Sequence, residues 1–267
     1  MNYKIGHSIA LVSLIISPMA FAKTSDDKTF AVSTGWIHIM PQSEEQGIDN
    51  HMTVSGLGID QEFNSSNAGF AVKDADTAGF IFDYFVNDHV ALEVVAGVPP
   101  EMELAGKGQI NIPLFGTEIK AADLSKFDNI ATTDAYTPTF LAKYHFGKID
   151  SKIRPYVGAG LMYGYFNDVK INPGVNAELN SNPILAALKP EIGKVKVDDA
   201  IAPVAIVGVD YNINQNWYTT ASVSYAHLST TATLDVVSQK NNETILQGKS
   251  NIEINPLVSY VGIGYRF

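Results

Sequence analysis

Apolar and polar residues alternate along the last stretch of the chain, from Asn255 to Phe267. Counting back from Phe267 in steps of two gives a face that is apolar apart from Ser259, whereas the other face carries Arg266. A period of two is typical of a β-strand with one covered face. Soluble edge strands are usually protected by charge or proline, so a strand that stays apolar to its last residue indicates a lipid cover and a closed sheet.

The same period predicts eight strands in all, at residues 30–40, 76–86, 89–98, 136–146, 154–167, 201–213, 217–231 and 255–267. Short polar turns at 87–88, 147–153 and 214–216 alternate with long segments at 42–74, 101–134, 168–200 and 232–254. The long segments are rich in polar residues and glycine, and we predict them to be loops. One short helix is expected near 182–188, where Asn182 is a candidate N-cap and Pro183 the first helical residue.

An even number of strands with short turns at one end and long loops at the other is typical of transmembrane β-barrels. We therefore predict an all-β fold, an eight-stranded antiparallel up-and-down transmembrane barrel with long extracellular loops and short periplasmic turns. A soluble lipocalin-like barrel has the same alternation and is the alternative. Aromatic side chains near the strand ends favour the membrane barrel, because they form girdles at the two interfaces. The face predicted to meet lipid includes Phe80, Phe82, Tyr84, Leu92, Phe140, Tyr144, Val157, Leu161, Val207, Tyr211, Trp217 and Tyr225.

The first residues predict a cleaved secretory signal over 1–22, followed by a barrel domain over 23–267. Lys4 precedes an apolar run at 9–16, and Ala20-Phe21-Ala22 is a small-residue cleavage site. The run is too short to span a bilayer, and a buried N-terminal helix is the alternative.

Composition narrows the function classes. Hydrophobic residues make up 46% of the 267 residues and charged residues 17%, enough apolar material for one sizeable core. The chain contains no cysteine, which excludes disulfides and cysteine-based catalysis or metal binding. A net charge of −10 argues against a nucleic-acid partner.

Six charged residues fall on the predicted inward face, all near the short-turn end. Three acids and three bases in a narrow interior can satisfy one another through charge-assisted hydrogen bonds. We interpret them as a structural plug, and a proton or ion relay is the alternative. The residues of this charge layer are Asp83, Glu93, Lys143, Arg154, Asp210 and Arg266.

Above these charges the inward positions become apolar. Porin lumens are polar, so an apolar interior suits an apolar ligand better than ions or sugars. Simple packing of a small barrel explains the pattern equally well. The candidate ligand path comprises Ile37, Ile39, Ile81, Val95, Leu141, Met162, Val204 and Ile206.

Catalytic motifs are poor. The chain has no Gly-x-Ser-x-Gly and no His-Glu-x-x-His, and its histidines lack ligand spacing. His227 and Ser229 share one face of a predicted strand, with Glu243 as a candidate third member, a pattern that resembles outer-membrane lipid A deacylases. Nothing else supports such chemistry, and we expect a protein without enzymatic activity, cofactor or metal.

Several segments resemble the OmpW family of small outer-membrane barrels, namely 151–160, 207–211, Asn216-Trp217 and 264–267, with weaker likeness at 130–132 and Pro138-Thr139. The resemblance implies a Gram-negative outer-membrane protein whose narrow apolar lumen, closed at the periplasmic side, takes up small hydrophobic or amphipathic molecules and releases them laterally into lipid. The aromatic C-terminus also resembles the signal that the outer-membrane assembly machinery binds.

Lateral release needs a weak seam between two strands. Pro99, Pro100 and Pro138 cannot donate hydrogen bonds, and they fall between the third and fourth predicted strands. We expect the ligand to leave there. The alternative is a structural or interaction barrel with a packed interior, whose loops bind a bacteriocin, a phage or a host surface.

Overall fold

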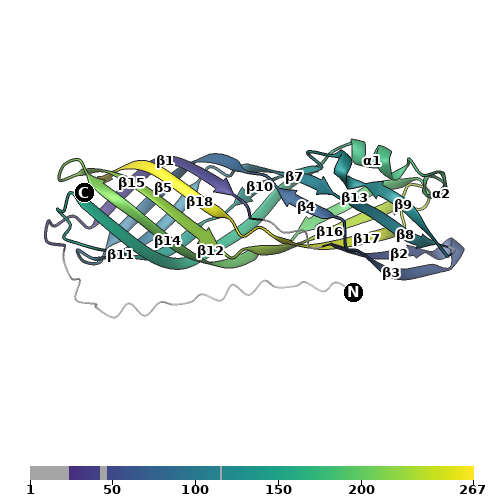
Figure 1. Cartoon of the computed structure of the whole chain (residues 1–267), viewed down its shortest axis with the longest axis horizontal. Helices are drawn as coiled ribbons and strands as arrows, with labels where there is room; N and C mark the ends of the chain where they lie inside the picture. Colours follow the sequence, from purple (N-terminus) through teal and green to yellow (C-terminus); the bar gives the residue numbers. More distant parts are fainter. Residues whose placement is uncertain (1–23, 43–46, 115) are drawn as a thin grey trace, which may run out of the picture.

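A computed structural model describes residues 24–42, 47–114 and 116–267, and the predicted signal peptide lies outside the described residues. The molecule is elongated, with a barrel at the end that carries the C-terminus and a second β-structure at the other end (Figure 1). We call this second part the extension. Because it replaces loops, the extension is the largest difference between the structure and the sequence-based prediction.

Eight antiparallel strands form the barrel, each hydrogen-bonded to two neighbours. The ring closes where β1 pairs with β18 and where β11 pairs with β12. In ring order the strands are β1 (Phe30–Met40), β5 (Ala75–Phe85), β6 (Val90–Gly97), β11 (Thr139–His145), β12 (Ile153–Ile171), β14 (Ala200–Asn212), β15 (Trp217–Ala226) and β18 (Leu257–Arg266). The predicted eight-stranded antiparallel barrel is confirmed.

Two predicted strands are broken in the structure. The strand expected at 136–146 divides at Thr137-Pro138, because Pro138 cannot continue the ladder. The strand expected at 217–231 ends at Ala226, and the next strand starts at Ser229. At each break the chain crosses between the barrel and the extension.

The prediction of four long loops was wrong. These segments form ten strands, two short α-helices and two short 3-10 helices among the described residues, and several of the strands alternate buried residues with exposed polar ones. Their richness in polar residues therefore reflects exposure to water and not irregular backbone. The elements are β2 (Ile48–Val54), β3 (Ile59–Ser65), β4 (Gly69–Val72), β7 (Glu101–Lys107), β8 (Gln109–Leu114), β9 (Thr117–Asp123), β10 (Ala131–Tyr136), β13 (Pro190–Val197), β16 (Ser229–Ser238), β17 (Thr244–Glu253), α1 (Gly174–Leu179) and α2 (Pro183–Ala186).

The extension is anchored to the barrel by continuous strands. Residues 156–162 of β12 pair with β11, and residues 165–171 of the same strand pair with β10. Strands β10, β7 and β4 extend the same sheet, whereas β13, β16, β17, β2 and β3 form a second sheet. Helix α2 confirms the predicted cap, because the Asn182 side chain accepts a hydrogen bond from Ile184 N at 2.9 Å. No helix among the described residues is long and apolar enough to cross a membrane.

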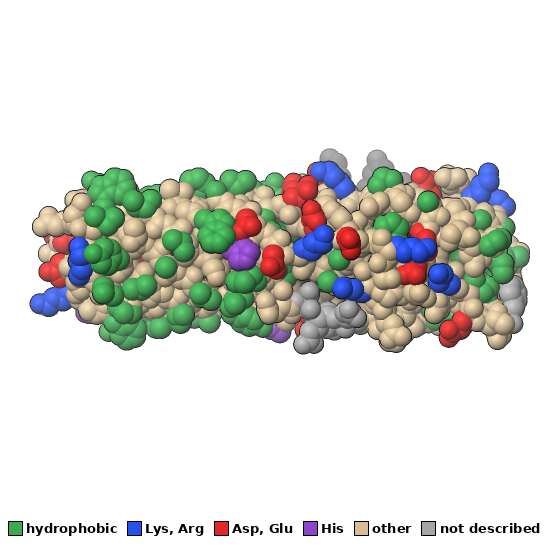
Figure 2. All heavy atoms as spheres, turned by 45° about the horizontal axis from the view of Figure 1, so that its top comes forward, with side chains coloured by type: hydrophobic (Ala, Val, Ile, Leu, Met, Phe, Trp, Pro, Cys, Tyr) green, Lys and Arg blue, Asp and Glu red, His purple; other side chains and the backbone are tan. Residues whose placement is uncertain are grey.

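The barrel exposes its apolar face outward. Large hydrophobic residues on the predicted lipid face, such as Phe82, Leu161 and Val207, are 51–58% exposed. Hydrophobic side chains cover the visible face of the barrel, and charged side chains gather where the extension begins (Figure 2). Lipid removes these outward apolar side chains from water, so the barrel needs no second protein layer around it.

Aromatic rings link the strands beside the C-terminus. Phe30 contacts both Tyr84 and Phe267, with ring centroids 5.3 and 6.3 Å apart, and Trp217 contacts Tyr265 at 5.1 Å. Because these rings come from neighbouring strands, they form part of the predicted interfacial girdle and place the terminal Phe267 within it.

Close strand contact at Gly160 provides a test of the barrel. A Cβ atom there would lie 1.8 Å from the backbone oxygen of Phe140, so Gly160→Ala must push β11 away from β12. We expect it to lower the free energy of unfolding by about 1–3 kcal/mol, as measured by urea unfolding in lipid vesicles. Gly56→Ala is the matched control, because a Cβ there meets no atom within 4 Å. Equal stability of the two variants would contradict the observed strand packing.

Candidate functional site

A cavity of about 310 Å³ occupies the barrel interior. All eight residues of the candidate ligand path line it, and most of them are nearly or fully buried. They come from β1, β5, β6, β11, β12 and β14, because inward positions of neighbouring strands share one level. The interior therefore contains open space as well as packed side chains, and we call this space the lumen cavity.

Two further cavities continue the lumen cavity into the extension. A neck cavity of about 70 Å³ shares Ile39, Met162 and Val258 with the lumen cavity. An upper cavity of about 110 Å³ shares Leu104, Thr133 and Ile252 with the neck. Because consecutive cavities have common walls, the three form one series from the extension to the barrel.

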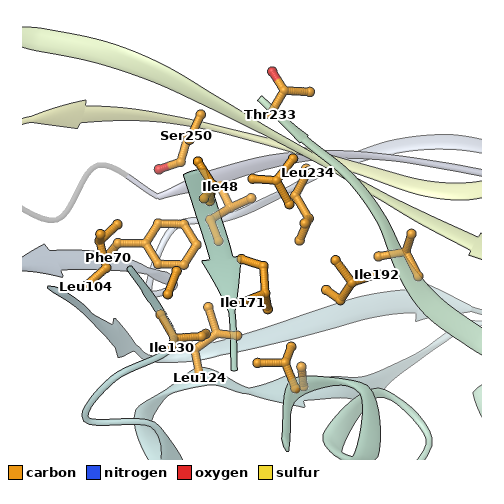
Figure 3. A pocket seen from close by; sticks show the side chains of 18 of the residues that line it. Ile48, Phe70, Leu104, Leu124, Ile130, Ile171, Ile192, Thr233, Leu234 and Ser250 are labelled. Carbon is orange, nitrogen blue, oxygen red and sulfur yellow. The ribbon is translucent and has the colours of Figure 1, made fainter. Parts of the chain in front are cut away.

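The upper cavity is the meeting point of the extension's elements (Figure 3). Its wall is almost wholly apolar, with Thr233 and Ser250 among its few polar residues. The apolar residues labelled in Figure 3 come from both sheets and from the segments beside them, and they are Ile48, Phe70, Leu104, Leu124, Ile130, Ile171, Ile192 and Leu234. Sequence reasoning missed this cavity, since its walls come from segments taken for loops.

The lumen cavity reaches the barrel wall at the predicted seam. Pro99, Pro100 and Pro138 all line it, together with Val98 and Tyr136, which are 54% and 41% exposed. Strands β6 and β11 pair only up to Val95↔Thr139, and β7 and β10 resume pairing at Glu101↔Asp134. The ladder between the two sides of the seam is interrupted over this interval.

The hydrogen bonds around the seam show which prolines weaken it. Ala135 N donates to Pro100 O at 3.0 Å, and Pro100 has no N–H with which to return a second bond. Tyr163 N of β12 donates to Pro138 O, so the missing donor of Pro138 faces β12, since both groups of a paired residue face the same neighbour. Contrary to the prediction, Pro138 therefore does not remove a hydrogen-bond donor from the seam. It does line the cavity there.

The six residues of the charge layer are all inside the barrel, at 0–5% exposed. They form two groups. In the upper group, Lys143 Nζ contacts Glu93 Oε2 and lies 2.7 Å from Asp83 Oδ1. Asp83 and Glu93 are cross-strand partners in the β5–β6 ladder, so without the ammonium their charges would repel.

The lower group surrounds Asp210. Arg266 Nη2 lies 3.3 Å from Asp210 Oδ2, and Arg266 Nη1 donates to Asn212 Oδ1 at 2.7 Å. Arg154, wholly buried and paired in register with Asp210, donates to the backbone oxygen of Asp88 at 2.6 Å. Charges from six strands thus fill the short-turn end of the barrel.

His145 is a member of this layer that sequence reasoning missed. It is fully buried between the rings of Phe85 and Tyr156, and its Nε2 lies 3.4 Å from Asp210 Oδ2. Its position two residues after Lys143 on one strand was the available signal, because residues i and i+2 share a face.

The turn below the layer is held by Asp88. Its carboxylate accepts a hydrogen bond from Ser25 N at 2.7 Å. Burial raises the pKa of Asp88, but the hydrogen bonding to Ser25 and the nearby His89 and Arg154 together outweigh this effect and leave the pKa below its ordinary value. The carboxylate therefore ties the segment before β1 to the turn that supports Arg154.

The candidate catalytic trio does not come together. Ser229 pairs with Glu253 at one end of the β16–β17 ladder, and Glu243 lies beyond its other end. Ten residues of strand separate the two acids, about 33 Å. Glu243 instead accepts hydrogen bonds from Ser55, which hold its pKa below the ordinary value. Among the described residues, no group of three or more His, Asp or Glu side chains could hold a metal ion.

Comparison with known proteins agrees with this architecture. The OmpW family model matches residues 29–267. The chain belongs to the OmpW family. Outer membrane protein W of Vibrio cholerae is 28% identical over 260 residues, which cover 97% of each chain. The location follows from these matches and the barrel fold: the protein is an outer-membrane β-barrel of the Gram-negative type, with its outer face in lipid.

A solved structure with a similar fold and a more distantly similar protein complete the comparison. The crystal structure of the outer membrane protein OprG from Pseudomonas aeruginosa has a TM-score of 0.66 and 21% identity, covering 92% of this chain and 97% of that one. This likeness shows that the present chain and OprG share a fold. The dibenzothiophene metabolism operon protein DoxH of Pseudomonas is 23% identical over 195 residues, 73% of each chain.

Removing Lys143 tests the charge layer. Lys143→Met leaves two buried carboxylates without their cation, so we expect the free energy of unfolding to fall by about 3–5 kcal/mol, measured by urea unfolding. Lys196→Met is the control, because the Lys196–Asp198 pair is exposed and such pairs contribute at most about 1 kcal/mol. If both variants unfold at the same urea concentration, the layer does not stabilise the barrel.

Proposed function

We propose that this barrel is a passive channel for small hydrophobic or amphipathic molecules, which enter through the extension and leave laterally into the membrane. The observation that carries the proposal is the series of three mainly apolar cavities with shared wall residues. A barrel interior that served only for stability would be filled with side chains, because voids cost stability. An apolar space of this size suits an apolar ligand.

The charge layer directs the ligand sideways. An apolar molecule cannot displace the paired charges below the lumen cavity without leaving buried ions unpaired, which is costly. The seam at Pro99 and Pro100 is the adjacent place where the ladder is interrupted. The ligand therefore leaves the lumen through the wall and not through the floor.

The relatives support an apolar cargo. DoxH is named for an operon of dibenzothiophene metabolism, and dibenzothiophene is an apolar aromatic molecule. The proposed function contains no catalytic step and no cofactor. Recognition of the C-terminal strand by the assembly machinery remains part of the same proposal.

Narrowing the path tests transport. Met162 lines both the neck and the lumen cavity, so Met162→Trp should reduce uptake of a fluorescent apolar probe to the rate of protein-free vesicles. The vesicles carry lipopolysaccharide in their outer leaflet to slow spontaneous entry. Leu161→Trp is the matched control, because that neighbour is 56% exposed to lipid. Equal uptake by the two variants would reject the internal route.

Strengthening the seam tests lateral release. Pro100→Ala adds an N–H that can donate back to Ala135 and complete a hydrogen-bonded pair, so transfer of the probe into the bilayer should slow severalfold. Pro138→Ala makes the same chemical change on the side that faces β12, and its transfer rate should match the wild type. A Pro100→Ala variant that transfers probe at the wild-type rate would place the exit elsewhere.

A further inference from the structure

A buried carboxylate in the wall of the lumen cavity has one oxygen without a hydrogen-bond partner among the described residues. Glu93 is 2% exposed and lines the cavity from β6. Its Oε2 atom pairs with Lys143, whereas its Oε1 atom accepts no hydrogen bond from any described residue. A buried acceptor left in this state costs free energy, which a donor on a bound molecule would recover.

The charges around Glu93 also favour a donor. Two carboxylates, those of Asp83 and Glu93, share the single ammonium of Lys143. The guanidinium of Arg266 pairs with Asp210 in the lower group, and that of Arg154 donates to Asp88 O. The upper group thus carries one negative charge more than positive charge, and the group's cavity-lining member is Glu93.

The wall above Glu93 suits the body of an amphipathic molecule. Leu141 is the register partner of Glu93 on β11, and Ile81 and Ile206 line the same cavity. Tyr260 also lines it, but its hydroxyl is already paired with Ser33 Oγ at 3.1 Å. The cavity therefore has an acceptor at its floor and a mainly apolar wall, in which Thr139, Ser222 and Ser224 are polar members.

We propose that Glu93 anchors the polar head of an amphipathic ligand whose head carries an O–H or N–H donor, such as a primary alcohol or a primary amine. The inference rests on the proposed channel function and specifies the ligand class of its lumen. The head donates to Glu93 Oε1, and the apolar body extends along Leu141 toward Met162. A hydrocarbon without a donor leaves the carboxylate oxygen unpaired and is held less tightly.

The test compares two photoreactive probes that differ only in the donor. One is a medium-chain primary alcohol with a diazirine in its chain, and the other is its methyl ether. The protein is placed in lipid nanodiscs, irradiated with each probe, and the labelled residues are mapped by mass spectrometry. We expect the alcohol to label lumen residues roughly tenfold more than the ether, as a hydrogen bond to a charged acceptor would give.

Two isosteric variants identify the acceptor. In Glu93→Gln the amide oxygen pairs with Lys143 and the amide N–H₂ faces the cavity, so the ratio of alcohol to ether labelling should fall to about one. Asp83→Asn removes the other carboxylate from Lys143 without altering a residue that lines the cavity, and it should keep the preference. Heat-modifiable electrophoretic mobility confirms that both variants are folded.

The outcomes separate this inference from the channel itself. Equal labelling of the lumen by both probes in the wild type, or a preference that persists in Glu93→Gln, would overturn the anchor and leave the channel standing. Absence of lumen labelling by both probes would overturn the proposed function and the anchor together.

Discussion

Backbone hydrogen bonding in lipid is the constraint on which the rest of this structure depends. The bilayer core offers no water to an unpaired N–H or C=O group, so every spanning strand needs two neighbours. The pairing of β1 with β18 meets this demand by joining the two ends of the chain's barrel. Closure in turn divides the side chains into an outer set that contacts lipid and an inner set whose members must pair or pack with one another.

The inner set meets that requirement in two different ways. At the short-turn end, the acids and bases of the charge layer pair with one another across strands far apart in the sequence. Above them the inward residues are apolar, and they leave space in place of complete packing. The seam is where the rule of complete pairing is relaxed, and it lies beside that space, next to prolines that cannot donate. The charge layer, the lumen cavity and the seam thus all follow from the way the eight strands pair around the barrel.

The extension gives the barrel a length that the strand pattern alone did not indicate. Its sheets continue barrel strands such as β12 and enclose the upper cavity between polar outer faces. In the proposed channel, the apolar entrance lies in the extension and away from lipid. In the proposed function, the extension therefore collects ligand before the lumen receives it.

The sequence by itself determined the barrel and the parity of its side chains. A strict period of two assigns Leu141, Lys143 and Met162 to the inside and Leu161 to the outside, because successive strand residues face opposite ways. It did not reveal β2 or β17, since strands with a solvent-exposed polar face have the composition of loops. Only the tertiary structure decided that Glu93 and Asp83 share one lysine, that Pro138 faces β12, and that three cavities share wall residues. Those facts depend on register between strands distant in the chain, which no local pattern specifies.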